Sequence, residues 1–211
     1  MIINQSINKE QLKQLPRAKF PGAIELIQTK ASALKALEYL NKHSVLGIDS
    51  ETRPAFVKGQ SYKVALLQIS SDEICYLFRL NMIGFIQPLI DLLENPNIIK
   101  VGLSLRDDFM MLNKRAALKQ KNCIDLQDYV NQFNIKDKSL QKIYALLFKE
   151  KISKSQRLTN WEAKELTDAQ KKYAAIDAWS CLKIYNLLEE LKESGNYTIA
   201  EPQQASTTSL K

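Results

Sequence analysis

The sequence predicts an α/β fold with one mixed sheet, in which three antiparallel strands come first, parallel strands follow, and helices flank the sheet. Two observations support this prediction. Three apolar segments in the first half are separated by short polar links, which is typical of strands paired by hairpins. After them, short apolar segments alternate with helical patterns, which indicates strands joined through helices.

The elements follow in order. Thr29 is expected to cap a helix over "TKASALKALEYLNKH", and the three hairpin-linked strands come next as "SVLGIDSE", "YKVALLQISS" and "EICYLFRL". The second half then predicts two strands, at 97–104 and 122–126, and helices at 84–96, 105–118, 127–134 and 139–150. A basic loop over 149–161 leads to a long last helix, where Thr167 and Gln170 form a capping box.

Length and composition predict one domain. The 211 residues are 45% hydrophobic and 25% charged, as in ordinary globular proteins. We expect an N-terminal arm at 1–22, the domain at 23–193, and a disordered tail at 194–211, where large apolar residues are rare. No apolar run predicts a membrane span, and the polar N-terminus is unlike a signal peptide, so we expect a cytoplasmic protein.

The composition also limits the chemistry. His43 is the single histidine, which excludes a multi-histidine zinc site and leaves no pattern for a catalytic triad. The three cysteines form no CxxC pair and lie in apolar segments, as buried free thiols do. Any metal would therefore have oxygen ligands, which favours magnesium or manganese. A net charge of +7 is compatible with a polyanionic partner without demonstrating one.

Acidic residues occur at three places where the pattern predicts burial. Asp49 and Glu51 end the first core strand, and because side chains alternate along a strand, both project from the same side. Like charges there are costly unless a cation lies between them. Asp107 and Asp108 open the helix after the strand at 97–104, where an aspartate is normally a cap or a dipole partner.

The third place is the last helix. Tyr173 lies four residues before Asp177, so the phenol and the carboxylate share one helix face. Taken singly, each acid has an ordinary structural explanation. The set, in this order along the chain, indicates a catalytic constellation.

These motifs resemble the DEDD superfamily of 3′-to-5′ exonucleases, in its tyrosine-bearing subclass, and in particular ribonuclease D and Werner-type exonuclease domains. "GIDSE" is similar to the first motif, "VGLSLRDDFMML" to the second and "YAAIDA" to the third, over roughly residues 24–192. The absence of any histidine after His43 indicates the tyrosine subclass. The resemblance assigns the second-motif acid to Asp108, although Asp107 could share or replace it.

The resemblance implies a ribonuclease H-like sheet and a two-metal mechanism with two Mg²⁺ or Mn²⁺ ions. Asp49 would bridge both ions, Glu51 and Asp177 would complete the ion that carries the attacking water, and Asp108 would support the second. Tyr173 would orient the water without binding metal.

The expected partner is the 3′ end of DNA or RNA. Lys154 and Arg157 in the basic loop and Lys172 beside Tyr173 predict a phosphate-binding rim, with a solvated charged face as the alternative. Arg53, with Phe56 and Tyr62, is a candidate contact to the terminal nucleotide.

Two other functions stay open at this point. One is a nucleic-acid-binding module of the same fold with weak or no catalysis. The other keeps the chemistry but acts on short oligonucleotides or structured RNA ends. The sequence decides neither DNA against RNA nor the oligomeric state.

Overall fold

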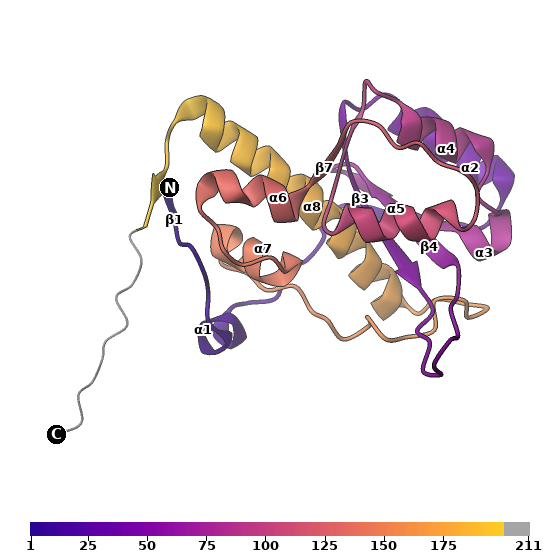
Figure 1. Ribbon diagram of the computed structural model, residues 1–211, viewed down its shortest axis with the longest axis horizontal. Coiled ribbons are helices and arrows are strands. Elements are labelled where there is room, and N and C mark those ends of the chain that lie inside the picture. Colours follow the sequence, from indigo (N-terminus) through magenta and orange to yellow (C-terminus); the bar gives the residue numbers. More distant parts are fainter. Residues whose placement is uncertain (201–211) are drawn as a thin grey trace.

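The computed structural model describes residues 1–200, and a six-stranded mixed sheet lies at its centre (Figure 1). The strand order is β2-β5-β4-β3-β6-β7. The strands are β2 (Ala23–Ile27), β3 (Val45–Thr52), β4 (Val64–Ser70), β5 (Ile74–Arg79), β6 (Ile99–Gly102) and β7 (Cys123–Asp125). The predicted sheet is confirmed, because β3, β4 and β5 pair antiparallel, and β6 and β7 add parallel to them.

Helices cover both faces of this sheet. They are α1 (Lys9–Gln14), α2 (Lys30–Leu40), α3 (Leu80–Ile83), α4 (Gln87–Glu94), α5 (Leu105–Asn113), α6 (Leu126–Tyr129), a 3₁₀ turn (Val130–Phe133), α7 (Leu140–Phe148) and α8 (Asp168–Ser194). Helices α2, α4 and α5 share one apolar core with the sheet, whereas α7 and α8 pack in a second core on the other side of β3. Figure 1 shows α6 and α7 beside α8, away from α2 and α4.

Capping explains where two of the helices begin. The Thr29 side chain accepts from the Ser32 N–H and Thr167 accepts from Gln170, each completed as a capping box. Helix α8 ends at Gly195, which adopts the left-handed conformation that glycine tolerates best. The two predicted N-caps are therefore confirmed.

The two ends of the described chain lie side by side. Strand β1 (Ile2–Ile3) pairs parallel with β8 (Thr198–Ile199), and Ile3 is fully buried. The segment predicted as an arm thus contains a strand and a helix, and part of the predicted tail is ordered. The rest of that tail, residues 201–211, lies outside the described residues.

Two further differences from the sequence prediction concern short elements. Strand β2 was not predicted, and it pairs parallel with β5 at the edge of the sheet. The single helix expected at 127–134 is instead α6 followed by the 3₁₀ turn. Within residues 1–200, no helix is both long and apolar enough to cross a membrane.

Candidate active site

Strand β3 carries two acids to the face of the sheet that α8 covers. Leu46 and Ile48 belong to the core beneath α2 and α4, so the alternate residues Asp49 and Glu51 point the other way. Gly47 makes this arrangement possible. A Cβ at Gly47 would lie 2.1 Å from the carbonyl oxygen of Ala178, so only glycine lets α8 approach β3 this closely.

Helix α8 supplies the third acid. Oxygens of Asp49, Glu51 and Asp177 all lie within 4.8 Å of one another, although Asp177 is more than 120 residues from the other two along the chain. Glu51 and Asp177 are nearly buried. Tyr173, one turn before Asp177, lines the same cleft. The sequence prediction that these four residues come together agrees with the structure.

Asp108 reaches the group from the opposite face of the sheet. Ser50, whose side chain alternates with those of Asp49 and Glu51, donates a hydrogen bond from Oγ to Oδ1 of Asp108 on α5. The neighbouring Asp107 is exposed. Of the two adjacent aspartates, the structure therefore directs Asp108 toward the end of β3.

Asp125 holds the start of α5 in place. Its two carboxylate oxygens accept from the backbone N–H groups of Ser104 and Leu105 at 3.0 and 2.8 Å. Ser104 itself adopts a left-handed conformation, with φ of 61°. The carboxylate therefore satisfies backbone donors that the helix start leaves without partners, and in doing so it fixes the approach of Asp108.

The clustered carboxylates hold their protons unusually well. Burial raises the pKa of Glu51 to about 9, and the charges of Asp177 and Asp108 add to the effect. Burial likewise raises the pKa of Asp177 to about 7, against the opposing influence of Tyr173 and Lys154. The pKa of Asp108 rises to about 7 through burial, opposed by Ser50. For Asp49, burial and then the charges of Asp108, Asp177 and Glu51 raise the pKa well above its ordinary value.

The phenol of Tyr173 is kept neutral by the same environment. Burial raises its pKa first, and the charges of Asp177 and Glu51 raise it further. Its ring lies 6.0 Å from that of the fully buried Trp161, which fixes its position. Tyr173 therefore keeps its O–H at neutral pH, as a donor or acceptor and not as a strong base.

A cleft of about 540 Å³ opens over the acids. Lys154 and Arg157, both predicted as phosphate contacts, line it. Arg53 and Lys172 are not among its lining residues. Arg53 instead pairs with Glu162 at 3.6 Å and lies over the Tyr62 ring, and Lys172 is exposed on α8.

Several residues of the cleft were not found from the sequence. Ser50 and Lys138 line it, and Asp125 supports it through α5. Lys138 donates from Nζ to the carbonyl oxygen of Gln127 at 2.5 Å. No motif marks these residues. The available signal was the position of Ser50 between two acids, which places it on the opposite face of β3.

The comparison with known protein families agrees with this geometry. Residues 24–192 match the model of a family described as 3′–5′ exonuclease. The chain belongs to this 3′–5′ exonuclease family. The matched segment contains the four acids and the tyrosine described above, so the site lies wholly within the family domain.

Three relatives illustrate the range of this exonuclease family. The mouse bifunctional 3′–5′ exonuclease/ATP-dependent helicase WRN is 33% identical over 85% of the chain, which spans 14% of that protein. An Arabidopsis thaliana 3′–5′ exonuclease is 29% identical over 89% of the chain and 71% of its own length. Ribonuclease D of Haemophilus influenzae is 23% identical over 87% of the chain and 46% of its own length.

Solved structures show the same fold. The Nibbler EXO domain of Aedes aegypti superimposes with a TM-score of 0.74 at 21% identity, over 82% of this chain and 90% of that one. Escherichia coli RNase D gives a TM-score of 0.71 at 23% identity, over 82% of this chain and 46% of that one. The ribonuclease H-like fold of these exonucleases is therefore confirmed for this chain.

Proposed function

We propose that this exonuclease-family domain is a metal-dependent enzyme that hydrolyses phosphodiester bonds one nucleotide at a time from the 3′ end of DNA or RNA. The observation that supports the proposal most is the cluster of Asp49, Glu51 and Asp177, with their oxygens within 4.8 Å, in a cleft rimmed by Lys154 and Arg157. Carboxylates this close repel one another when ionised unless a cation lies between them, and a cationic rim suits a phosphodiester substrate.

The donor set is suited to Mg²⁺ or Mn²⁺. All candidate ligands are carboxylate oxygens, and within residues 1–200 no salt bridge reaches Asp49, Glu51, Asp108 or Asp177. Asp49, Glu51 and Asp177 would hold one ion, and Asp49 with Asp108 would hold a second. Two such ions, when bound, would activate the attacking water and neutralise charge on the phosphoryl group and the leaving oxygen.

The protein's own side chains would supply orientation. Tyr173, neutral and anchored against Trp161, would position the attacking water through its hydroxyl. Lys154 and Arg157 would hold the substrate phosphates over the acids. Ser50 would keep the carboxylate of Asp108 pointed at the site.

A second function, nucleic-acid binding without efficient catalysis, would need the same cleft but not the acids. The presence of four acids and a tyrosine in one place favours catalysis. A solved structure of Trypanosoma brucei RNase D, whose fold this chain shares at a TM-score of 0.71, is described as a complex with RNA U12. For this chain, DNA and RNA are both candidate substrates.

The deciding experiment uses single strands of DNA and RNA labelled at the 5′ end, with Mn²⁺, Mg²⁺ or EDTA. We expect products that shorten by one nucleotide at a time, only with a divalent metal. The Asp49→Asn protein is the inactive control. Early release of internal fragments would indicate an endonuclease, and binding without any shortening would indicate the non-catalytic module.

A further inference from the structure

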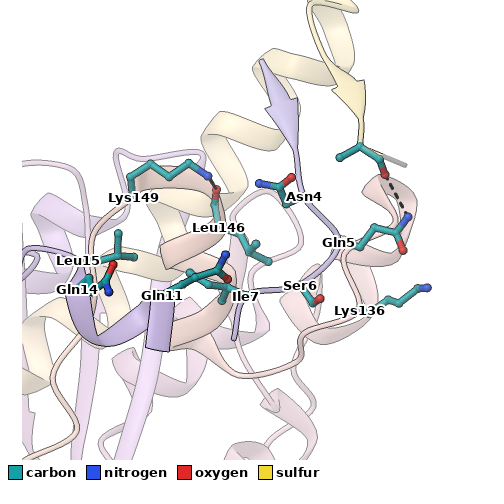
Figure 2. A pocket seen from close by; sticks show the side chains of 11 residues that line it. Asn4, Gln5, Ser6, Ile7, Gln11, Gln14, Leu15, Lys136, Leu146 and Lys149 are labelled. Atoms are coloured by element: carbon teal, nitrogen blue, oxygen red, sulfur yellow. Dashed lines mark hydrogen bonds between the residues drawn. The ribbon is translucent and has the colours of Figure 1, made fainter. Parts of the chain in front are cut away.

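A second cavity, of about 630 Å³, opens between the N-terminal segment, the C-terminal end of α7 and Ala200 (Figure 2). We call it the arm pocket. Carboxamides and ammonium groups dominate its polar lining, which includes Asn4, Gln5, Gln11, Gln14, Lys136 and Lys149. Figure 2 shows the two lysines on opposite sides of the view, with Gln11 and Ile7 between them. No carboxylate is among the described residues that line the pocket.

The lining chemistry suits a nucleotide. Carboxamides both donate and accept hydrogen bonds, so they can meet the edge of any base, and lysines attract phosphate. Ile7, Leu15 and Leu146 add an aliphatic surface for a base face. The side chain of Gln14 has no hydrogen-bond partner within residues 1–200, and Lys149 is held at the pocket by a 2.8 Å bond from Nζ to the Leu146 carbonyl oxygen.

Helix α7 connects this pocket to the active-site cleft. Leu140 and Gln141 at its start line the cleft, and Leu146 and Lys149 at its other end line the arm pocket. Nine helical residues span about 13 Å. A strand whose bases stay stacked advances about 3.4 Å per nucleotide, as each strand of B-form DNA does, so this length corresponds to about four stacked nucleotides.

The segments on either side of α7 also line both cavities. Before α7, Lys136 lines the arm pocket and Lys138 lines the cleft. After α7, Lys149 lines the arm pocket and Lys154 lines the cleft. Residues 136–157 contain seven basic and two acidic side chains, a net +5 in a chain whose total is +7. The net positive charge of the chain is therefore concentrated in the segment from which residues line both cavities.

We propose that the arm pocket binds a nucleotide of the substrate strand, about four positions from the 3′ end that occupies the cleft. This inference rests on the proposed nuclease function. It adds a second anchor point, so binding should strengthen once a single strand is long enough to occupy both cavities. Because every base can present donors and acceptors to the carboxamides, the anchor should not depend on sequence.

The test places negative charge in the arm pocket without changing side-chain shape. Gln11→Glu/Gln14→Glu preserves α1, because glutamate at position 11 completes the capping box with Asn8 as glutamine does. Gln28→Glu/Gln132→Glu makes the same change at exposed sites away from both cavities and is the matched control. Binding of a fluorescein-labelled ten-nucleotide strand is followed by anisotropy in EDTA, so that no cleavage occurs.

We expect the dissociation constant to rise about tenfold for the pocket variant and less than twofold for the control. For a three-nucleotide strand, too short to span the cavities, kcat/KM with Mn²⁺ should be the same in both variants. Equal dissociation constants for the two variants would overturn the inference, as would a fold-loss of kcat/KM on the three-nucleotide strand as large as the fold-loss of affinity for the ten-nucleotide strand. Failure of the nuclease assignment would look different, because the unsubstituted protein would then leave the three-nucleotide strand uncleaved with Mn²⁺.

Discussion

Tyr173 and Asp177 lie one helical turn apart on α8 and have separable roles in the proposed mechanism. Tyr173→Phe removes one oxygen but keeps the ring against Trp161. We expect catalysis to fall by about 10²–10⁴-fold, the usual range for a positioned proton-handling group, with the melting temperature and the response to Mn²⁺ unchanged. Asp177→Asn should lose both activity and the response to Mn²⁺. Steady-state rates and thermal melts of both variants check the contrast, and full turnover by Tyr173→Phe would make the tyrosine a packing residue.

Asp107 and Asp108 provide a matched pair on one helix. Asp108 accepts a hydrogen bond from Ser50, whereas Asp107 is exposed. Asp108→Asn should therefore lose most activity, and Asp107→Asn should keep most of it, because both changes remove one charge at nearly constant shape. The measurement is kcat/KM on a labelled strand with Mn²⁺. The reverse order of effects would move the second-motif acid to Asp107.

The sequence was sufficient to predict the acids but not their supporting residues. Asp49 and Glu51 follow from strand alternation, and Tyr173 with Asp177 from helical spacing, because both periodicities are local. Ser50 and Asp125 act through partners 58 and 21 residues away, which no local pattern reports. Arg53 and Lys172 were predicted from charge near a motif, and charge alone does not fix the direction of a long side chain.

At the scale of elements, the contact between β3 and α8 builds the site, and Gly47 is its closest point. Gly47→Ala would drive a Cβ into the Ala178 carbonyl oxygen, so α8 must shift away from β3. We expect a loss of about 3 kcal/mol or more in the free energy of unfolding, since the added Cβ would overlap a backbone atom, which cannot move aside as a flexible side chain can. The separation of Asp177 from Asp49 should also weaken stabilisation by Mn²⁺.

Gly59→Ala is the control for this change, measured in the same urea titrations. A Cβ at Gly59 meets nothing within 4 Å, and its φ of 83° should cost only about 1–2 kcal/mol. Its response to Mn²⁺ should match that of the unsubstituted protein. Equal losses in the two variants would show that close packing at Gly47 does not hold α8 in place.

The elements that the sequence did not predict are those that depend on distant partners. Strand β2 is a five-residue edge strand, and its pairing with β5 joins residues about 50 positions apart. Strands β1 and β8 have two residues each and pair across nearly the whole described chain. The longer strands and helices were predicted because their apolar periodicity is strong within one segment.

For the whole molecule, the acidic cluster should make stability depend on both pH and metal. The folded-state pKa of Asp108 and of Asp177 is about 7 and that of Glu51 about 9, against ordinary values of 3.8 and 4.5. Between pH 4 and pH 9 the folded protein therefore binds more protons than the unfolded chain. The free energy of unfolding without metal should accordingly fall as pH rises through this window.

Divalent metal should reverse this trend, because it binds the folded state through deprotonated carboxylates. We expect melting temperatures in EDTA to decrease from pH 5 to pH 9, and the increase on adding millimolar Mn²⁺ to become larger over the same range. Asp49→Asn/Asp177→Asn should flatten both dependences by removing the charges that repel one another. Asp72→Asn/Asp91→Asn, which neutralises two exposed aspartates away from the cluster, is the matched control and should keep both dependences. A melting temperature that is independent of Mn²⁺ at every pH would contradict a metal site at this cluster, since a cation bound between ionised carboxylates must stabilise the folded state.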